Sequence, residues 1–309
     1  MRVLTLGAGA IGGYFGGRLA EGGAEVTFLV RDGRKRQLLD QGIRIESAFG
    51  DYSAPAKAIT ADEIETPADV VLLTCKAYDL LSAIDAIRPA MAQETVILPL
   101  LNGLAHMELL NREFGSDRVL GGLAKIAAMS LPDGTIKHLN DWRYVTFGEQ
   151  NGVMSQRVLA LKEAFDRTSV IASVVPDIMH AMWEKLVHLT TAAGMTCLMR
   201  ANVGEIARVD DGNDLMIRFL ATNAEIATRE GYAPSETFLD EYRALFSDRT
   251  STYTSSMLRD LERGGPVESD HIIGFMLDKV RQHRLDDTLH LAAYVHLKAY
   301  EERRAAGRL

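Results

Sequence analysis

A glycine-rich turn near the start of the chain constrains its fold more than any other feature. Residues 7–13 read Gly-Ala-Gly-Ala-Ile-Gly-Gly, after an apolar run at 3–6 and before a helical pattern at 11–21. In strand–turn–helix units of this kind, the glycines allow a tight turn, close approach to a pyrophosphate, and close packing of helix on strand. The pyrophosphate binds the free N–H groups at the helix start. The alternative is an ordinary strand–helix unit with a glycine-rich turn. The dinucleotide interpretation predicts cofactor contacts at Gly7, Gly9, Ala10, Ile11 and Gly12.

Composition and charge narrow the class of protein. The chain has 309 residues, 47% hydrophobic and 25% charged, which is enough for two domains with cores of their own. Its net charge of −8 suggests no general affinity for nucleic acid or for an anionic membrane. Cys75 and Cys197 are far apart and are expected to be reduced thiols. Met1 leads almost directly into the first apolar run, which leaves no room for a signal peptide, and no apolar run is long enough to span a bilayer. We therefore expect a cytoplasmic protein.

The first half of the chain alternates between strand-like and helix-like segments. Apolar runs recur at 3–6, 26–30, 70–74 and 96–101, with helical patterns around 11–21, 77–90 and 104–113. This alternation predicts a mostly parallel, doubly wound sheet, that is, an α/β Rossmann domain. Two segments are expected to form hairpins instead: 43–59, which turns at Phe49-Gly50-Asp51, and 124–148, which turns at Pro132-Asp133-Gly134.

The second half of the chain has a different pattern. From about residue 177, strand-like runs vanish and helical periodicity continues to the end, and Asp177 is expected to cap a long helix that starts near Ile178. We therefore predict a Rossmann domain over residues 1–175 and an all-α domain over residues 176–309.

Arg31 directly follows the second predicted strand, 19 residues after Gly12. An acidic residue near this position selects NAD in such folds, whereas an arginine accommodates the 2′-phosphate of NADP. Arg34, Lys35 and Arg36 add positive charge, and the forked guanidinium suits a phosphate. These residues favour NADP(H), although Asp32 adds an acidic group nearby and a solvated basic loop is the alternative.

Four further motifs carry a family resemblance. They are Cys75-Lys76-Ala77-Tyr78, Leu101-Asn102-Gly103, Trp183-Glu184-Lys185-Leu186, and Ser255-Ser256-Met257-Leu258-Arg259-Asp260 followed by Glu268-Ser269-Asp270 and Gly274. Together with the glycine-rich turn, their order and spacing resemble the ketopantoate reductase (2-dehydropantoate 2-reductase) family over nearly the whole chain.

The resemblance implies NADPH-dependent reduction of a 2-oxo acid to a 2-hydroxy acid, in a cleft between a Rossmann domain and a helical domain. It also implies a role in pantothenate biosynthesis. In this family pattern, Lys185 matches the catalytic lysine, and Lys76 and Asn102 match residues that line the cofactor and substrate cleft. Ser256 and Glu268 match substrate-contacting positions.

The chemistry of these residues agrees with that role. Hydride transfer to a ketone builds negative charge on its oxygen, which a nearby acid must neutralise by giving up a proton. Lys185 can do so, because its pKa falls on partial desolvation, and Glu268 could orient it or hold a substrate hydroxyl. Asn102 can donate to a carboxylate, and Lys76 can neutralise substrate or cofactor charge. Each residue also has a simpler interpretation: a surface lysine, a turn asparagine, or a carboxylate or hydroxyl at a helix end.

The chain departs from the family pattern at three positions. The family carries asparagine four and eight residues after the lysine, where this chain has Leu189 and Ala193. It also carries asparagine directly before the glycine of the last motif, where this chain has Ile273. A polar substrate group would be left without a partner there. Nearby replacement contacts are His188, Thr190 and Thr191, which are equally well interpreted as ordinary helix residues. The departures predict a carbonyl substrate that is less polar than ketopantoate or differently shaped.

Other functions remain open at this point. The fold also suits a dehydrogenase acting on another hydroxy acid or a polyol, an opine-type imine reductase, or a non-catalytic NADP(H)-binding redox sensor. The Lys185→Ala variant separates an enzyme from a sensor. We expect a small-molecule substrate and no nucleic-acid, membrane or metal partner, and we leave open whether the protein is a homodimer.

Overall fold

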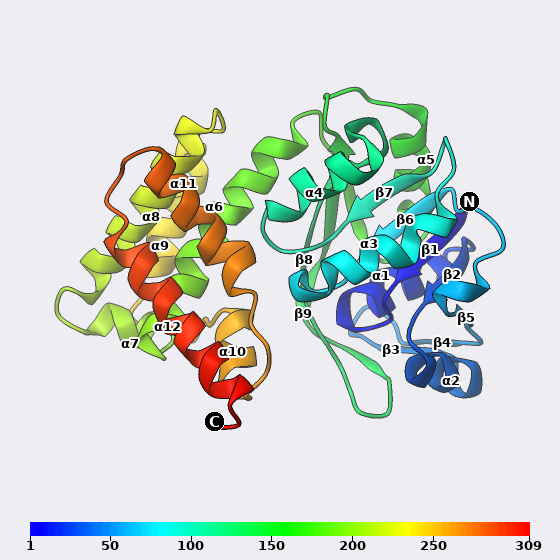
Figure 1. The fold of residues 1–309 in the computed structure, drawn as a ribbon, viewed down its shortest axis with the longest axis horizontal. Helices are drawn as coiled ribbons and strands as arrows, with labels where there is room; N and C mark the ends of the chain where they lie inside the picture. The colour runs from blue at the N-terminus through cyan, green and yellow to red at the C-terminus, as the bar shows by residue number, and fades with distance from the viewer. The chain divides into compact units, whose positions relative to one another are not determined.

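The computed structural model describes all residues from Met1 to Leu309. Their contacts divide the chain into two compact units (Figure 1). The first unit contains Met1–Leu101 and His106–Ile178, and the second, which we call the helical unit, contains Asn102–Ala105 and Met179–Leu309. The fold is the predicted one: an α/β domain with a parallel sheet, and an all-α domain.

A five-stranded parallel sheet forms the centre of the first unit. Its order is β5-β2-β1-β6-β7, and the strands are β1 (Arg2–Leu6), β2 (Glu25–Leu29), β5 (Lys57–Ile59), β6 (Val70–Leu73) and β7 (Val96–Pro99). All residues of β6 and β7 are buried, which explains why both strands are continuous apolar runs rather than alternating ones. The four strands predicted from these runs are confirmed.

Helix α1 (Ala10–Glu21) packs between this sheet and a second sheet. Its glycines allow the close approach on both sides. A Cβ on Gly16 would lie 2.8 Å from the ring of Phe28 in β2, and a Cβ on Gly17 would lie 2.7 Å from Ile45 of the second sheet. The glycine-rich sequence therefore continues into the helix for packing reasons, beyond the turn itself.

The second sheet has the order β10-β9-β3-β4, with β8 paired to β9. Its strands are β3 (Ile43–Glu46), β4 (Tyr52–Ala54), β8 (Leu120–Ser130), β9 (Ile136–Glu149) and β10 (Ile171–Val174). The hairpins β3–β4 and β8–β9 are antiparallel, so both predicted hairpins form. The prediction was wrong in carrying the first hairpin on to residue 59. The strand β5 leaves it after Pro55 and joins the parallel sheet beside β2.

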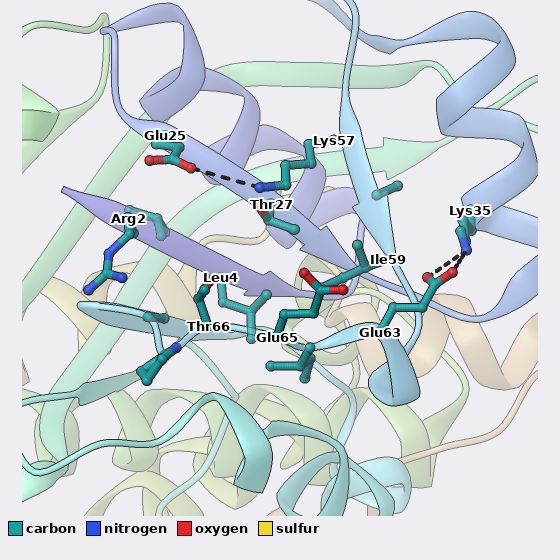
Figure 2. A pocket seen from close by; sticks show the side chains of 15 residues that line it. Arg2, Leu4, Glu25, Thr27, Lys35, Lys57, Ile59, Glu63, Glu65 and Thr66 are labelled. Carbon is teal, nitrogen blue, oxygen red and sulfur yellow. Dashed lines mark hydrogen bonds and ion pairs between the residues drawn. The ribbon is translucent and has the colours of Figure 1, made fainter.

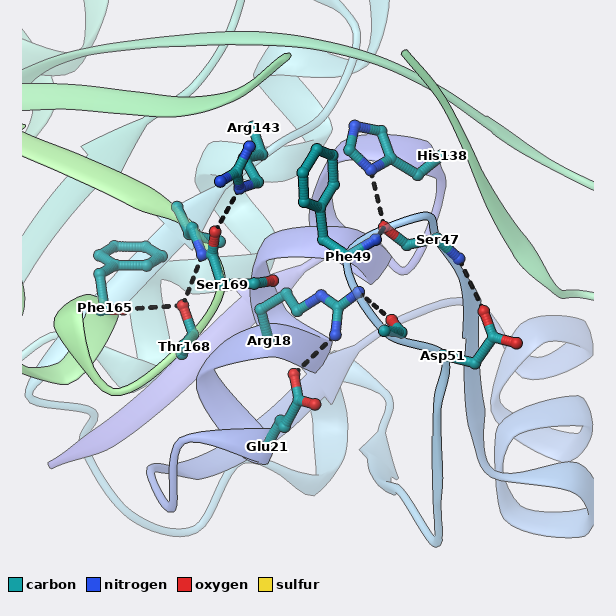
Figure 3. Close-up of polar contacts among 12 residues, drawn as sticks. Arg18, Glu21, Ser47, Phe49, Asp51, His138, Arg143, Phe165, Thr168 and Ser169 are labelled. Carbon is teal, nitrogen blue, oxygen red and sulfur yellow. Dashed lines mark hydrogen bonds and ion pairs between the residues drawn. The ribbon is translucent and has the colours of Figure 1, made fainter. Parts of the chain in front are cut away.

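A buried arginine ties the β3–β4 turn to α1 (Figure 3). Arg18 is almost completely buried; it donates to Glu21 at 2.7 Å and to the carbonyl of Gly50 at 2.6 Å. On the other side of the turn, Ser47 Oγ lies 2.9 Å from His138 Nδ1 in β9. These bonds hold the second sheet against α1, and α1 begins at the glycine-rich turn.

The crossover from β5 to β6 contains no α-helix. A single 3₁₀ turn, η1 (Ala61–Glu63), leads into an irregular segment at 64–69, which leaves a cavity of about 390 Å³ beside β1, β2 and β5. Lys35 and Glu63 form an ion pair at one end, and Lys57 and Glu25 form a second at 3.8 Å (Figure 2). Arg2 is paired as well, with Asp69, which is not labelled in the figure. Of the labelled charged side chains, Glu65 has no ion-pair partner drawn.

The remaining helices of the first unit cover the sheets. They are α2 (Asp32–Gln41), α3 (Leu80–Ile87), α4 (Ala105–Phe114) and α5 (Gln156–Asp166), with short 3₁₀ turns η2 (Ala77–Asp79), η3 (Arg88–Ala90) and η4 (Ser116–Arg118). The helical pattern predicted at 77–90 is thus one α-helix between two 3₁₀ turns, and Pro89 lies in the second of them.

The longest helix of the helical unit is α6 (Ile178–Met199). Its other helices are α7 (Val203–Arg208), α8 (Gly212–Arg229), α9 (Glu236–Ser247), α10 (Ser256–Glu262), the π-turn η5 (Asp270–Gly274), α11 (Phe275–Gln282) and α12 (Thr288–Ala305). A buried polar chain crosses its core: His290 Nε2 lies 2.9 Å from Asn223 Oδ1, and Asn223 donates to Thr191 at 3.0 Å. None of the helices in the molecule combines the length and apolar composition needed to cross a membrane.

Candidate active site

A groove of about 940 Å³ opens at the carboxyl ends of β1, β2, β5 and β6. The glycine-rich turn forms part of its wall through Gly7 and Gly9, and the residues after β2 and β6 form other parts through Arg31 and Cys75. The direction in which the chain adds strands reverses at β1: β2 and β5 lie on one side of it, and β6 and β7 lie on the other. Ligands of open α/β sheets bind at such positions.

Two glycines in the turn are required by geometry. Gly7 has φ +91°, which a side chain would make strained. Gly12 has no room for a Cβ, which would lie 2.2 Å from the carbonyl oxygen of Gly7 and 2.3 Å from Thr74 Oγ1. The Thr74 hydroxyl itself donates to the carbonyl of Leu6 at 2.8 Å and so joins the ends of β1 and β6. Thr74 was missed by sequence reasoning, because a threonine at a strand end has no distinctive pattern.

Gly9 and the start of α1 have the opposite character. A Cβ on Gly9 would meet nothing within 4 Å, so its backbone faces open space. No side chain caps the first turn of α1, which begins at Ala10 and Ile11. The first backbone N–H groups of a helix have no intrahelical partners and lie at its positive end. The turn therefore presents donors that suit a pyrophosphate.

The basic residues after β2 do not act as one cluster. Arg31 is 83% exposed and pairs with Asp79 at 2.8 Å. Arg34 donates instead to the carbonyls of Ala8 at 2.9 Å and Gly134 at 3.0 Å, so it braces the glycine-rich turn. Lys35 pairs with Glu63. Arg36 and Asp32 are exposed. Of the arginines and lysine that line the groove, Arg31 is thus the one whose charge is most open to a ligand.

Lys185 and Asn102 come together in the helical unit. Lys185 lies in the second turn of α6, and its Nζ donates to Asn102 Oδ1 at 3.2 Å. Burial lowers the pKa of Lys185 to about 8, and the negative charge of Glu268 acts in the opposite direction. Glu268 is itself buried. A lysine with this pKa is half-protonated at about pH 8 and mostly protonated at neutral pH, so it can donate a proton there.

The loop that carries Asn102 is fixed by its neighbour. Gly103 has φ +83°, and a Cβ there would lie 2.8 Å from the carbonyl oxygen of His271. His271 belongs to the π-turn η5, two residues after the buried Ser269. Single π-turns within helices occur frequently at functional sites. Gly103 is therefore required for the packing of this loop against η5 as well as for the turn.

The remaining predicted residues lie in different surroundings. Ser256 is exposed in the first turn of α10, and no hydrogen bond connects it to Lys185 or Asn102. Its neighbour Ser255 is the N-cap, and its Oγ lies 2.8 Å from Thr196 Oγ1 of α6. Lys76 is half-buried and directly precedes η2.

Glu184, next to Lys185, has a structural role. It accepts hydrogen bonds from the backbone N–H of Ser235 at 3.0 Å and from its hydroxyl at 2.9 Å, at the start of α9. The adjacent carboxylate in the Trp-Glu-Lys-Leu motif thus holds two helices together.

The positions that depart from the family pattern differ in burial. Leu189 is half-buried, whereas Ala193 and Ile273 are buried, and Ile273 packs beside Gly194 of α6. Thr191 belongs to the buried polar chain and also donates to the carbonyl of Val187, as the alternative of an ordinary helix residue predicts. Thr190 is completely buried.

His188 joins an aromatic cluster that sequence reasoning missed. Its Nε2 lies 2.9 Å from the hydroxyl of Tyr253, and its ring stacks on Tyr242 at 4.3 Å between centroids. These residues are spread over 66 positions of the chain, so no local motif indicates them.

Comparison with known proteins points to one family in both halves of the chain. Residues 3–152 match the family model "Ketopantoate reductase PanE/ApbA", and residues 177–301 match "Ketopantoate reductase PanE/ApbA C terminal". The chain is 35% identical over 301 residues to the uncharacterized oxidoreductase YkpB of Bacillus subtilis, covering 97% of this chain and 99% of that one. It is 26% identical to a 2-dehydropantoate 2-reductase of Halobacterium salinarum, covering 92% and 93%.

Solved structures give the same result. The crystal structure of 2-dehydropantoate 2-reductase from Methylococcus capsulatus superposes with a TM-score of 0.88 at 27% identity, covering 99% of this chain and 98% of that one. A D-mandelate dehydrogenase with NADH and anilino(oxo)acetate shares the fold, with a TM-score of 0.85 at 18% identity over 99% of both chains.

Proposed function

This chain belongs to the ketopantoate reductase PanE/ApbA family of oxidoreductases, and on that premise we propose that it reduces a 2-oxo acid to the 2-hydroxy acid with NADPH, using Lys185 as the general acid. The observation that carries the proposal is the bond from Lys185 to Asn102, together with a lysine pKa of about 8. Ketopantoate is the first substrate to test, because the named relatives are 2-dehydropantoate 2-reductases.

The glycine-rich turn fits a nicotinamide dinucleotide. Gly9 leaves open space where a side chain would block a pyrophosphate, and the uncapped start of α1 offers N–H donors. Gly7, Ala10, Ile11 and Gly12 complete this cradle. When bound, the nicotinamide supplies the hydride.

Arg31 supports NADPH over NADH. Its guanidinium is exposed, and its bond to Asp79 joins two exposed side chains, which contributes little energy. It can exchange that partner for a dianionic phosphate, to which an arginine binds through two parallel hydrogen bonds. Lys76 would add positive charge near the cofactor or the substrate.

Lys185 would act on the ketone oxygen. Its ammonium donates a hydrogen bond to the oxygen as negative charge develops, and then transfers the proton. Asn102 accepts from the same ammonium, which limits the directions in which Nζ can point. Glu268 favours the protonated form, because its charge raises the pKa that burial has lowered. Ser256, exposed at the start of α10, is left for the substrate carboxylate.

The test compares Lys185→Ala with the unmodified chain and with Lys162→Ala, a surface lysine on α5 that pairs with Asp166. NADPH oxidation is followed with a panel of 2-oxo acids, and NADPH binding is followed by its fluorescence. Loss of general-acid catalysis predicts that kcat for Lys185→Ala falls by at least about a hundredfold, with NADPH affinity kept.

Two outcomes would contradict the proposal. Equal kcat in Lys185→Ala and Lys162→Ala would remove Lys185 from the chemistry. Tight NADPH binding without turnover of any carbonyl compound would indicate the redox-sensor alternative.

A further inference from the structure

Arg34, on α2, bonds the glycine-rich turn and the turn between β8 and β9 at the same time. Its Nη2 donates to the carbonyl oxygen of Ala8 at 2.9 Å and to that of Gly134 at 3.0 Å. Its Nε also donates to Ala8, at 3.2 Å, and its Nη1 donates to Gln37 Oε1 at 2.5 Å. All of these acceptors are neutral oxygens. Arg34 therefore brings a positive charge to the wall of the groove without a bonded carboxylate to cancel it.

The turn between β8 and β9 fixes the place of this guanidinium. Arg44 of β3 holds the turn by donating to the carbonyl of Asp133 at 2.7 Å and to its carboxylate at 3.1 Å. The next residue, Gly134, has φ +84°, and a Cβ there would lie 2.2 Å from Arg34 Nη1. Any side chain at Gly134 would thus displace the guanidinium. A residue 100 positions away in the chain consequently decides where Arg34 lies.

The bonds to Ala8 also fix the peptide group that joins Ala8 to Gly9. This peptide is trans. A trans peptide is planar, and its C=O and N–H point in opposite directions. Because Arg34 holds the carbonyl oxygen of Ala8 on the side of α2, the N–H of Gly9 points away from α2. No group of the chain accepts a hydrogen bond from this N–H, and Gly9 lines the groove.

A backbone N–H without a partner in the wall of a groove is a donor for a bound anion. We propose that Arg34 is a positioning residue for the dinucleotide: by holding the Ala8 carbonyl it directs the Gly9 N–H at the pyrophosphate, and the β8–β9 turn keeps it in place through Gly134. This inference rests on the proposed use of a nicotinamide dinucleotide. It gives Arg34 a role different from that of Arg31, because NADPH and NADH share the pyrophosphate, whereas only NADPH has the 2′-phosphate.

Cofactor affinities test the role of Arg34 directly. Arg34→Ala should weaken the binding of NADPH and of NADH by the same factor, about tenfold or more, because both lose a charge-assisted hydrogen bond at the pyrophosphate. Arg34→Lys keeps the positive charge but lacks the planar fork that reaches both carbonyls, so it should not restore the original affinity. Isothermal titration with both cofactors measures these effects. A loss confined to NADPH in Arg34→Ala, or unaltered affinity in Arg34→Lys, would overturn the positioning role.

A change at Gly134 tests the same role without altering a residue that lines the groove. Gly134→Ala retains the charge of Arg34 and displaces its guanidinium, so it should weaken the binding of both cofactors by about threefold or more. Gly23→Ala is the matched control, since Gly23 has φ +87° and open space where its Cβ would lie. It introduces a similar backbone strain away from Arg34. Equal affinities in Gly134→Ala and Gly23→Ala would contradict the contribution of the β8–β9 turn.

The amide of Gly9 gives a second measurement, which needs no cofactor. Amide NMR spectra of protein with isotope-labelled glycine identify the Gly9 signal by its loss in Gly9→Ala. That signal should shift in Arg34→Ala and in Gly134→Ala, and it should stay in place in Gly23→Ala. An unshifted Gly9 signal in Arg34→Ala would overturn this inference and leave the proposed reductase activity intact.

The proposed function fails in a different way. If the unmodified chain binds both cofactors but reduces no carbonyl compound, the reductase activity is overturned and the role of Arg34 is still decided by the affinities and by the Gly9 signal. If it binds neither cofactor, both proposals are overturned.

Discussion

The pKa of Lys185 is set by burial and by its charged and polar neighbours. Burial lowers its pKa, the charge of Glu268 opposes that effect, and Asn102 accepts one hydrogen bond without contributing charge. The pKa of the amine therefore lies close to the pH range in which the group can both hold and release a proton.

The pH dependence of reduction should report this environment. If the Lys185 ammonium is the proton donor, as proposed, kcat/KM for reduction should fall as the pH rises through about 8, and the oxidation of the 2-hydroxy acid should rise over the same range. Lys185→Arg should lose this transition, since an arginine stays protonated. A flat profile across that range in the unmodified enzyme would exclude Lys185 as the acid.

Arg31 and Asp79 should set the preference between the two cofactors. On the proposed contact with the 2′-phosphate, Arg31→Ala should remove a charge-assisted bond and lower NADPH affinity by about tenfold or more, with NADH affinity unchanged. Asp79→Asn frees Arg31 from an exposed ion pair and should tighten NADPH binding by up to about fivefold. Isothermal titration with both cofactors measures this, and Arg36→Ala is the control. Equal losses for NADPH and NADH in Arg31→Ala would contradict a phosphate contact.

The sequence locates these residues better than it assigns their roles. Arg31, Arg34 and Lys35 form a single basic run in the sequence, yet each takes a different partner in the structure. Those partners, Asp79, the Ala8 carbonyl and Glu63, lie 26 to 48 residues away, and no local pattern can predict them.

At the scale of elements, the junction between β1 and α1 separates two kinds of glycine. Gly12 is required because the backbone of the turn and Thr74 occupy the space that a side chain needs. At Gly9, by contrast, the position of a Cβ atom has no neighbour within 4 Å. One glycine thus serves the fold, and the other leaves room for a ligand.

Alanine substitutions should separate these two requirements. Gly12→Ala forces a contact at 2.2 Å with backbone, which should cost about 1–3 kcal/mol of unfolding free energy and also weaken NADPH binding. Gly9→Ala should leave the unfolding free energy within about 0.5 kcal/mol of the original value, because the site is open and φ is negative. It should nevertheless weaken NADPH binding, since the added methyl group faces the groove. Urea denaturation and NADPH fluorescence titration measure the two effects; unaltered NADPH binding in Gly9→Ala would place the cofactor elsewhere.

Strands were predicted well where their apolar runs are continuous, and less well at the sheet edge. The strands β6 and β7 were evident because all of their residues are buried and apolar, and β1 and β2 were evident because most of theirs are. The edge strand β5 has three residues, of which Lys57 is exposed, so its sequence lacks that signal and it was assigned to the preceding hairpin. Pro55, which cannot donate to a sheet, marks the point at which the hairpin ends.

At the scale of the whole molecule, stability depends on a polar chain inside the helical unit. His290 is completely buried, and burial lowers its pKa from 6.5 to about 4. The unfolded chain therefore binds a proton between these pH values and the folded chain does not.

The helical unit should consequently lose stability in acid. The contribution of His290 is fully present above pH 6.5 and is lost as the pH falls to about 4. A difference of this size corresponds to about 3 kcal/mol. His290→Gln should flatten the dependence of the urea midpoint on pH across this window while keeping an amide near Asn223. Parallel midpoint curves for the two proteins would contradict the assignment to His290.

The assignment of Asn102–Ala105 to the helical unit has a consequence for inheritance. The partner of Lys185 is encoded 83 residues upstream, within the half of the gene that otherwise specifies the sheet domain. A recombinant that joined residues 1–176 of this chain to the remainder of a relative would combine the Asn102 loop of this chain with the lysine helix of the relative. That loop and that helix would not have evolved together. Since Gly103 also packs against the carbonyl of His271, the loop and η5 must change together. The two halves of the gene are therefore expected to diverge as one inherited unit rather than as exchangeable modules.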